Sequence, residues 1–399
     1  MPVVQSEPAA PPRGWVEALD EEFFAHAFER RPYVARGVHA GDLDELVALD
    51  TLEYLLISPP GAQFSYVRLG KVLPDGTWDV TKLAADLSLA RLVQGYRDGY
   101  SILVDEAQAR WPSLAAQCAA LQERIARRGG VIAHNRATCG LFLTPPRAQG
   151  SAPHYDCKDV FAVQVAGSKT WRLHAPPVEA PLHNSADGEI DAPRLGEPVL
   201  EVTLGPGDLL YVPRGFVHAP LTRDERSLHL SFGVATITWT EILRPMLEAR
   251  AELRQSVPAR LLEPGAEEAL RGALASLLAA LDDAPEAAQR LRLLALASLV
   301  GETQVAAGRL ADATAERSEE LDDDVALEKR YGARCLVDRT GRELALAFPG
   351  RLLGVPLAWQ PAVERVIASD RVTVGEVGRD VAAHLLDAGF LRRARPNGA

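Results

Sequence analysis

The amino-acid sequence predicts a mixed fold in three parts: an all-β barrel or sandwich, a helical bundle and a small C-terminal module of helices and strands. From Asp156 to about Ile237, short strand-like runs are separated by Gly and Pro, a pattern typical of barrels and sandwiches. From Thr238 to about Arg330, the chain is dense in Ala, Leu, Glu and Arg and has almost no strand signal. Beyond Arg330, alternating apolar residues return together with helix signals.

The composition is that of a globular protein. Its 399 residues, 47% of them hydrophobic, suffice for two or three domains with ordinary cores. The net charge of -11 gives no case for binding nucleic acid or an anionic membrane. The four cysteines form no C-x-x-C pair, and no apolar run has the length of a membrane span or the pattern of a secretory signal. We therefore expect a cytoplasmic protein with no membrane partner and no nucleic-acid partner.

The region before the barrel is expected to mix helices and strands after a mobile tail over residues 1–13. Asp20 is placed to cap the first helix. The expected helices lie within 15–30, 44–56, 79–96 and 112–128. The expected extended segments lie at 32–37, 64–69, 101–104 and 137–156.

Five strands are expected within the barrel, at 160–165, 170–173, 199–204, 208–212 and 227–234. Gly167 and Ser168 are predicted to form a two-residue hairpin loop between the first two strands, because Gly supplies the positive φ that such a turn needs. The polar residues 182–196 are expected to cross the mouth of the barrel as a loop.

The helical region is punctuated by prolines at 258, 264 and 285. Pro285 behind Asp282 and Asp283 fits the capped start of a long helix that reaches about Leu310. A stripe of leucines at helical spacing fits either the core of the bundle or a dimer face. Its members are Leu270, Leu274, Leu277, Leu278 and Leu281.

The C-terminal region reads as a winged-helix-like module. Extended segments are expected at 333–337 and 343–347, and a helix at 359–367. Thr373 and Glu376 form a capping box that opens a last helix through Leu386. No helix rich in Arg, Asn or Gln stands out, so we expect a structural or protein-contact role rather than DNA binding.

The candidate functional residues begin with His154 and Asp156, which precede a strand. Side chains two residues apart on extended backbone point to one face, so both can bind one metal ion. His218, which follows Pro-Gly-Asp and Val-Pro-Arg-Gly segments, is the candidate third ligand. Two imidazoles and one carboxylate leave three adjacent positions of Fe(II) open, enough for a bidentate 2-oxo acid and then O2.

Lys169 is the candidate cation for the distal carboxylate of such an acid, if the acid is 2-oxoglutarate. In the predicted hairpin Lys169 lies opposite Ala166. A straight strand from Asp156 would place Ala166 roughly 33 Å away, so the chain must bend at residues 157–159. The alternative for Lys169 is a solvated turn lysine. His229 shares a face with Ser227 and Ser231 and is read as a core histidine or as support for a ligand.

With these residues in place, the sequence resembles the JmjC-type cupin oxygenases of the bacterial cupin-4, or ribosomal oxygenase, family. The matching segments are 15–37, Leu143-Thr-Pro-Pro through His154-Tyr-Asp, 159–173, and Pro206-Gly-Asp through His218. The resemblance implies a double-stranded β-helix (jelly-roll) catalytic domain over 14–237, a helical dimerisation domain over 238–330 and a winged-helix-like domain over 331–399. It also implies a homodimeric hydroxylase, dependent on Fe(II) and 2-oxoglutarate, that acts on Arg or His side chains of ribosomal proteins.

The resemblance carries site roles by position. It makes His154, Asp156 and His218 the iron ligands, pairs Lys169 with the C5 carboxylate of 2-oxoglutarate and places Ser231 in the lining of that pocket. Several relatives carry Asn where this chain has Gly140, which bears on contacts to cosubstrate or substrate.

The mouth loop supplies the candidate substrate contacts, His183, Asp187 and Glu189, and its acids suit a basic target. Two other kinds of function stay open: the same chemistry on a ribosomally made peptide or a small molecule, and a non-catalytic dimeric cupin scaffold. Lysine demethylation is less favoured, since no aromatic cage is evident.

Overall fold

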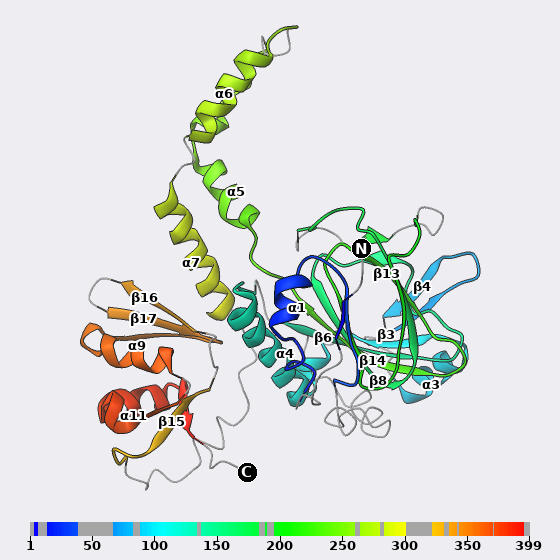
Figure 1. Cartoon of the computed structure of the whole chain (residues 1–399), viewed down its shortest axis with the longest axis horizontal. Coiled ribbons are helices and arrows are strands. Elements are labelled where there is room, and N and C mark those ends of the chain that lie inside the picture. Colours follow the sequence, from blue (N-terminus) through cyan, green and yellow to red (C-terminus); the bar gives the residue numbers. More distant parts are fainter. Residues whose placement is uncertain are drawn as a thin grey trace.

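The structure is a computed structural model. It describes residues 4–6, 14–38, 67–82, 88–133, 137–182, 188–189, 195–259, 264–279, 283–300, 321–330, 335–340, 343–369 and 371–394. Three parts follow one another along the chain (Figure 1): a unit of two β-sheets, an arm of helices and a smaller C-terminal unit. The expected helix at 44–56 and the end of the long helix beyond Val300 lie outside the described residues.

Two sheets face each other in the first part, which we call the double-sheet unit. The larger sheet has the order β1-β2-β12-β8-β14-β6-β5-β3-β4 and the smaller β10-β7-β13-β9-β11. The larger sheet contains β1 (Val4–Ser6), β2 (Tyr33–Ala35), β3 (Val67–Val72), β4 (Trp78–Lys82), β5 (Ser101–Val104), β6 (Thr138–Thr144), β8 (Asp159–Gly167), β12 (Leu209–Val212) and β14 (Ser227–Val234). The smaller sheet contains β7 (His154–Tyr155), β9 (Lys169–His174), β10 (Gly188–Glu189), β11 (Leu200–Leu204) and β13 (Val217–Leu221).

The chain passes from sheet to sheet at both ends of β8. β7 lies in the smaller sheet and β8 in the larger, so the predicted bend at residues 157–159 is confirmed. The predicted hairpin at Gly167 and Ser168 is wrong, because β8 and β9 belong to different sheets and do not pair. Gly167 does have a positive φ of 61°, and a Cβ there would lie 1.8 Å from the carbonyl oxygen of Arg226, so the corner requires glycine.

Helices and aromatic side chains close the outer side of the larger sheet. Asp20 caps α1 (Glu21–His26) by accepting a hydrogen bond from the Phe23 amide at 2.9 Å, as predicted. Phe23 then packs at 5.0 Å from Tyr211 and 6.1 Å from Phe161, measured between ring centroids. α4 (Pro112–Arg124), continued by a π-helical turn at Ile125–Gly129, confirms the helix expected at 112–128.

Two expectations for this region are wrong. Residues 79–96 are not one helix: β4 pairs with β3, and only α3 (Leu89–Arg97) is helical. Asp75 and Gly76 turn the chain between β3 and β4, with Asp75 accepting from the Thr77 amide at 2.9 Å. The N-terminal tail is also not wholly mobile, because β1 pairs in parallel with β2.

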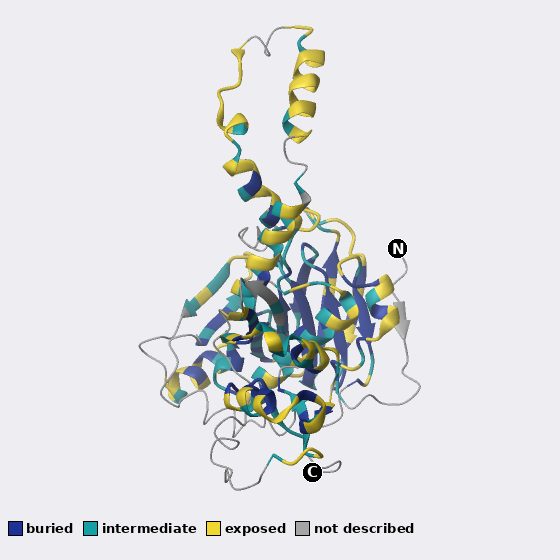
Figure 2. Cartoon of the chain, turned by 90° about the vertical axis from the view of Figure 1, so that its left-hand side faces the viewer, coloured by how far each residue is buried: buried dark blue, intermediate teal, exposed yellow. Residues whose placement is uncertain are grey.

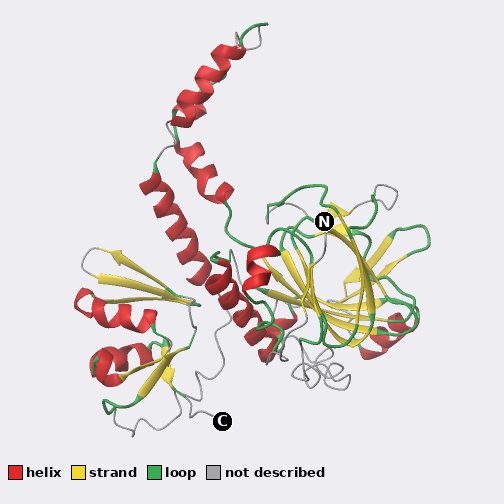
Figure 3. Ribbon diagram, viewed as in Figure 1, coloured by secondary structure: helices red, strands yellow, loops and turns green. Residues whose placement is uncertain are grey.

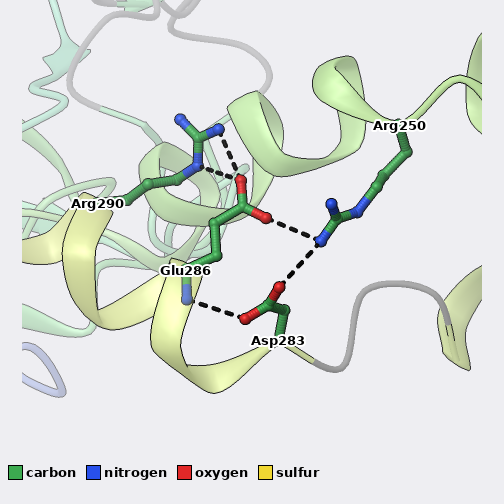
Figure 4. A network of polar contacts seen from close by, with 4 residues as sticks. All are labelled: Arg250, Asp283, Glu286 and Arg290. Carbon is green, nitrogen blue, oxygen red and sulfur yellow. Dashed lines mark hydrogen bonds and ion pairs between the residues drawn. The ribbon is translucent and has the colours of Figure 1, made fainter.

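Three helices form the middle part, which we call the helical arm: α5 (Trp239–Ala249), α6 (Glu267–Ala279) and α7 (Ala284–Val300). An ion network joins the end of α5 to the start of α7 (Figure 4). Arg250 Nη2 lies 2.8 Å from Glu286 Oε2 and 3.4 Å from Asp283 Oδ2, while Arg290 binds the other oxygen of Glu286 at 2.8 Å. Asp283 also accepts from the Glu286 amide at 3.0 Å, which confirms the predicted acidic cap ahead of Pro285.

α6 extends away from both folded units, and its residues are mostly exposed (Figure 2). Leu274 and Leu278 are 51% and 65% exposed, and α6 contributes no buried residue. Within this chain, the described part of the leucine stripe is therefore not the core of a bundle, and Leu281 lies outside the described residues. α7 bridges the neighbouring parts: Ser298 donates to the carbonyl oxygen of Ala133, and the Gly350 amide donates to that of Leu299.

The C-terminal unit has its own apolar core, which includes Leu327, Phe348 and Phe390. Its strands are β15 (Ala326–Lys329), β16 (Leu336–Thr340), β17 (Glu343–Phe348), β18 (Arg351–Pro356), β19 (Arg371–Thr373) and β20 (Leu391–Arg393). Its helices are α9 (Gln360–Ala368), α10 (Val374–Val377) and α11 (Arg379–Asp387) (Figure 3). The predicted capping box is present, with the Thr373 amide donating to Glu376 at 2.7 Å. Because β15 pairs with β19 and β20, this unit begins before the expected boundary at 331.

Within the described residues, the longest apolar helices fall short of what a membrane crossing requires.

Candidate metal centre

Neighbouring strands of the smaller sheet bring the three candidate ligands together. His154 of β7 pairs directly with His218 of β13, and Asp156 follows β7 by one residue. The two imidazole centroids are 4.4 Å apart, and His218 Nε2 lies 3.7 Å from Asp156 Oδ2. One ligand atom from each of the three residues lies within 4.8 Å of the others, a spacing that suits a single ion. The sequence prediction of this cluster is therefore matched by the geometry.

Backbone carbonyls orient both histidines. His154 Nδ1 lies 2.7 Å from the carbonyl oxygen of Ala152, and His218 Nδ1 lies 3.2 Å from that of Phe216. A protonated Nδ1 donates to these oxygens and leaves each Nε2 with its lone pair for a metal ion. Burial, and to a lesser degree the nearby His154, lowers the pKa of His218 to about 4, so its imidazole is neutral near pH 7. Two neutral imidazoles and a carboxylate are a donor set that fits Fe(II).

The loop between β12 and β13 contacts the backbone beside the three candidate metal ligands. The Gly215 amide donates to the backbone carbonyl oxygen of Asp156 at 2.9 Å. Gly215 has a φ of 89°, and a Cβ there would lie 2.6 Å from the carbonyl oxygen of Val178, so the loop needs glycine. The Val-Pro-Arg-Gly segment noted in the sequence thus positions both strands that carry ligands.

A buried polar cluster braces the same loop. Tyr211 Oη donates to Asp159 Oδ1 at 2.6 Å and accepts from the Glu29 amide at 2.8 Å. The Arg214 amide approaches Asp159 Oδ1 at 3.4 Å. Burial raises the pKa of Asp159 to about 6, partly offset by the hydrogen bond from Tyr211. Sequence reasoning missed this cluster, whose members are far apart along the chain.

A cavity of about 610 Å³ opens on the three ligands and extends between the two sheets. Lys169 lies at one end, 2% exposed, with its Nζ 3.0 Å from Thr144 Oγ1. Thr144 Oγ1 in turn accepts from Ser101 Oγ at 3.1 Å. Burial lowers the pKa of Lys169 to about 7. Lys169 is therefore a buried amine of the cavity wall and not the solvated turn lysine of the alternative reading.

The other end of the cavity lies past the far end of β5. Asp105 and Glu106 follow Val104 there, about 13 Å along the strand from Ser101. Arg68 Nη2 donates to Asp105 Oδ1 at 2.6 Å, and Lys158 also lines this part. The formal charges of these two acids and two bases balance, so charge alone selects no substrate.

Gly140 and Ser231 face each other in the floor of the cavity, on β6 and β14. A Cβ at position 140 would lie 2.9 Å from Cε2 of Phe142, so any side chain there would displace the phenyl ring. Gly140 therefore leaves room beside Ser231.

The other candidate residues have mixed outcomes. Trp171 and Cys157 are buried. His183 and Asp187 lie outside the described residues, and Glu189 is described only through the backbone of β10, where it pairs with His154. β13, which carries His218, was not among the expected strands.

Comparison with known proteins agrees with this geometry. Residues 115–242 match the model of the JmjC domain. A 227-residue stretch is 34% identical to the bifunctional lysine-specific demethylase and histidyl-hydroxylase NO66 of Drosophila simulans, covering 54% of this chain and 24% of that protein. For NO66 of Culex quinquefasciatus the values are 29% identity, 60% of this chain and 37% of that protein. The chain thus spans only a quarter to about a third of these relatives.

Solved structures resemble the chain over nearly its whole length. The crystal structure of the Escherichia coli ribosomal oxygenase YcfD aligns with a TM-score of 0.53 and 19% identity, covering 94% of this chain and 97% of that one. YcfD in complex with cobalt and 2-oxoglutarate aligns with a TM-score of 0.52 and 19% identity, covering 93% and 97%. Residues 115–242 are therefore similar to the JmjC domain, and the fold resembles that of the ribosomal oxygenase YcfD over nearly the whole chain.

Proposed function

We propose that this protein is an Fe(II)- and 2-oxoglutarate-dependent oxygenase that hydroxylates an amino-acid side chain of a protein. One observation carries the proposal: His154, Asp156 and His218 converge at a cavity whose far end holds the buried cation Lys169. A dicarboxylic 2-oxo acid matches both features, since one end chelates a metal ion and the other is an anion. The YcfD complex with cobalt and 2-oxoglutarate supports the same pairing.

In this proposal, different residues bind the metal ion and the cosubstrate. His154, Asp156 and His218 hold Fe(II), which supplies the activation of O2 for insertion of one oxygen atom into a C–H bond. Lys169 and Thr144 bind the C5 carboxylate of 2-oxoglutarate, and Ser231 lines the floor of the cavity. The two sheets exclude water from the space between these groups.

We propose a ribosomal protein as the substrate, with Arg or His as the hydroxylated residue. The fold shared with a ribosomal oxygenase and the sequence similarity to a histidyl-hydroxylase support this substrate class. The balanced charges of Arg68, Asp105, Glu106 and Lys158 favour neither residue. His183, Asp187 and Glu189 are the proposed substrate contacts, although Glu189 belongs to β10 and not to the loop expected over 182–196. A cytoplasmic location is part of the proposal.

Intact-mass analysis of ribosomal proteins tests the substrate. Proteins from cells with the intact gene, a deletion and a His218→Ala allele are compared. We expect one ribosomal protein to be heavier by one oxygen atom in the first strain only. If no ribosomal protein shifts while the purified enzyme still converts 2-oxoglutarate to succinate, the substrate is a different peptide or a small molecule. A purified protein that binds neither Fe(II) nor 2-oxoglutarate would instead point to a non-catalytic scaffold.

Lysine demethylation appears in the names of the NO66 relatives, but the cavity gives it little support. Among the described lining residues, the Phe142 ring stacks on His229 and the Trp171 ring packs against His229 and His218. Trp78 faces the guanidinium of Arg68 at 6.0 Å. These rings are occupied and do not form an aromatic cage for a methylated ammonium group.

We further propose that the three parts have separate roles: a catalytic domain over 14–237, a helical dimerisation domain that begins at 238, and a winged-helix-like domain that ends the chain. The exposed apolar side chains of the helical arm support a homodimer, because a lone chain leaves them in water. They include Trp239, which is 74% exposed, together with Leu243, Leu247, Leu274 and Leu278. The longer described helices of the C-terminal unit, α9 and α11, are not rich in Arg, Asn or Gln, which supports a protein contact rather than nucleic-acid binding.

A further inference from the structure

His229 of β14 lines the cavity together with Lys169 and His218. Its side chain is buried, with 2% of the residue exposed. Burial lowers the pKa of His229 well below its usual value, and the charges of Lys169 and then of His218 lower it further. The imidazole is therefore neutral and lies within electrostatic reach of both groups, with Lys169 exerting the larger effect.

Two aromatic rings hold the imidazole in place. Phe142 stacks on it with centroids 4.8 Å apart and planes at 10°, and Trp171 meets it edge to face at 5.3 Å. Such contacts fix the plane of the ring and so pre-organise its polar atoms. A histidine held this way meets a ligand without losing side-chain freedom.

The nitrogen Nδ1 of His229 has no hydrogen-bond partner among the described residues. Buried polar atoms in folded proteins are nearly always paired, so an unpaired one requires a specific explanation, such as a catalytic role or a bound water or ion. A neutral imidazole has one N–H donor and one acceptor. Because no described protein group pairs with Nδ1, the fold does not dictate which nitrogen carries the proton, and a bound anion selects the tautomer that donates to it.

We propose that His229 is a cosubstrate-binding residue whose ring N–H, together with the ammonium of Lys169, binds the distal carboxylate of 2-oxoglutarate. The strand register favours the distal carboxylate over the metal-chelating end: His229 lies two residues from Ser227 on β14, and Ser227 pairs with Thr144, the hydrogen-bond partner of Lys169. This role rests on the proposed function and adds a selectivity: the cavity prefers a 2-oxo acid with a second carboxylate over one that ends in a methyl group. Sequence reasoning favoured a satisfied core histidine, whereas the structure leaves Nδ1 unpaired.

The test uses the His229→Phe variant, which keeps an aromatic ring between Phe142 and Trp171 but has no hydrogen-bond donor. The full-length protein is loaded with Mn(II) as a redox-inert metal, and binding is measured by titration calorimetry. We expect the Kd for 2-oxoglutarate to rise about 10- to 100-fold, the range for losing a hydrogen bond to a charged group. The Kd for 2-oxobutyrate, which lacks the distal carboxylate, should stay the same in variant and wild type.

Two controls separate binding from folding. The unfolding temperature of the ligand-free variant should be unchanged or higher, because Phe removes an unpaired buried nitrogen. His229→Gln, which keeps an N–H donor, should recover part of the affinity for 2-oxoglutarate. Equal Kd values for 2-oxoglutarate in wild type and His229→Phe would overturn the proposal, as would an equal loss for both acids. If wild-type protein itself binds neither Mn(II) nor 2-oxoglutarate, the proposed function fails, and this role fails with it.

Discussion

The double-sheet unit and the helical arm differ in how far their apolar side chains are buried. The double-sheet unit encloses its own core, in which Phe161, Phe232 and Leu230 are fully buried. The arm leaves Trp239, Leu274 and Leu278 largely in water. The first unit buries its core within one chain, whereas in the proposed homodimer a second chain would cover the apolar side chains of the arm. Changes to the unit should therefore act on the site or on folding at any protein concentration, and changes to the arm should act on association.

The largest expected effect comes from placing charge on the arm. Leu274→Glu with Leu278→Glu would introduce four carboxylates into the interface of the proposed symmetric dimer. At about 1 kcal/mol of lost apolar burial per position, the dimer dissociation constant should rise on the order of 1,000-fold. Sedimentation velocity over a concentration series measures the change. Ser276→Glu, on the opposite face of α6, is the control and should stay dimeric. A double variant that sediments like wild type would remove the arm from the interface.

The next largest effect is expected from removing one metal ligand of the double-sheet unit. His218→Ala should weaken binding of Fe(II) under anaerobic conditions by more than about 100-fold, because even residues that only orient a ligand cost 10- to 100-fold. Its oligomeric state should not change. His26→Ala, at the exposed end of α1, is the control. Unchanged metal affinity in both His154→Ala and His218→Ala would refute the metal centre.

A change in the buried cluster of Tyr211 and Asp159 should have a smaller effect, on the stability of the fold. Tyr211→Phe leaves the carboxylate of Asp159 without its 2.6 Å donor and the Glu29 amide without its acceptor. The free energy of unfolding at pH 7 should fall by about 2–3 kcal/mol, as urea denaturation measures. Tyr100→Phe, which loses a hydrogen bond to Asp79 at the surface, should cost less than about 1 kcal/mol. Equal losses in the two variants would show that the Tyr211 cluster is not a special support of the site.

The smallest expected effect is a change in the affinity for 2-oxoglutarate of about tenfold per pH unit, or about 1.4 kcal/mol. Burial lowers the pKa of Lys169 to about 7 in the ligand-free protein, and a bound carboxylate raises it. Above pH 7, binding of 2-oxoglutarate therefore takes up a proton, and the affinity should be flat below pH 7 and fall as the pH rises above it. Lys169→Arg, charged throughout, should abolish this slope. A wild-type affinity that is independent of pH between 7 and 9 would argue against Lys169 as the carboxylate partner.

The local features of the fold were predictable, because caps, turns and alternation are encoded by near neighbours. The Asp20 cap, the Thr373 capping box and the strands around Phe161 and Leu230 are examples. The bend after Asp156 was also predictable, since a straight strand could not bring Lys169 and the ligands to one cavity. The partner of a strand, in contrast, depends on residues far along the chain. Gly167 signals a turn in either case, and only the whole fold decides that it is a corner between sheets.

The candidate site was predictable where residue type and spacing express the chemistry, as for His154, Asp156, His218 and Lys169. It was not predictable for Tyr211, Asp159 and His229, whose roles arise from burial and from contacts between distant strands. The function of the leucine stripe was left open by its spacing alone, because a core and an interface require the same pattern. The exposure of Leu274 and Leu278 on α6 argues against a core within this chain, and the dimer face stays a proposal.

The most direct test of the proposed chemistry follows succinate formation by the purified, Fe(II)-loaded protein given 2-oxoglutarate, O2 and a total ribosomal protein extract. Wild-type protein should release succinate and transfer one oxygen atom to a protein of the extract, and His218→Ala should do neither. Absence of succinate from wild-type protein that has bound both Fe(II) and 2-oxoglutarate, or equal succinate from wild type and His218→Ala, would contradict the proposed oxygenase.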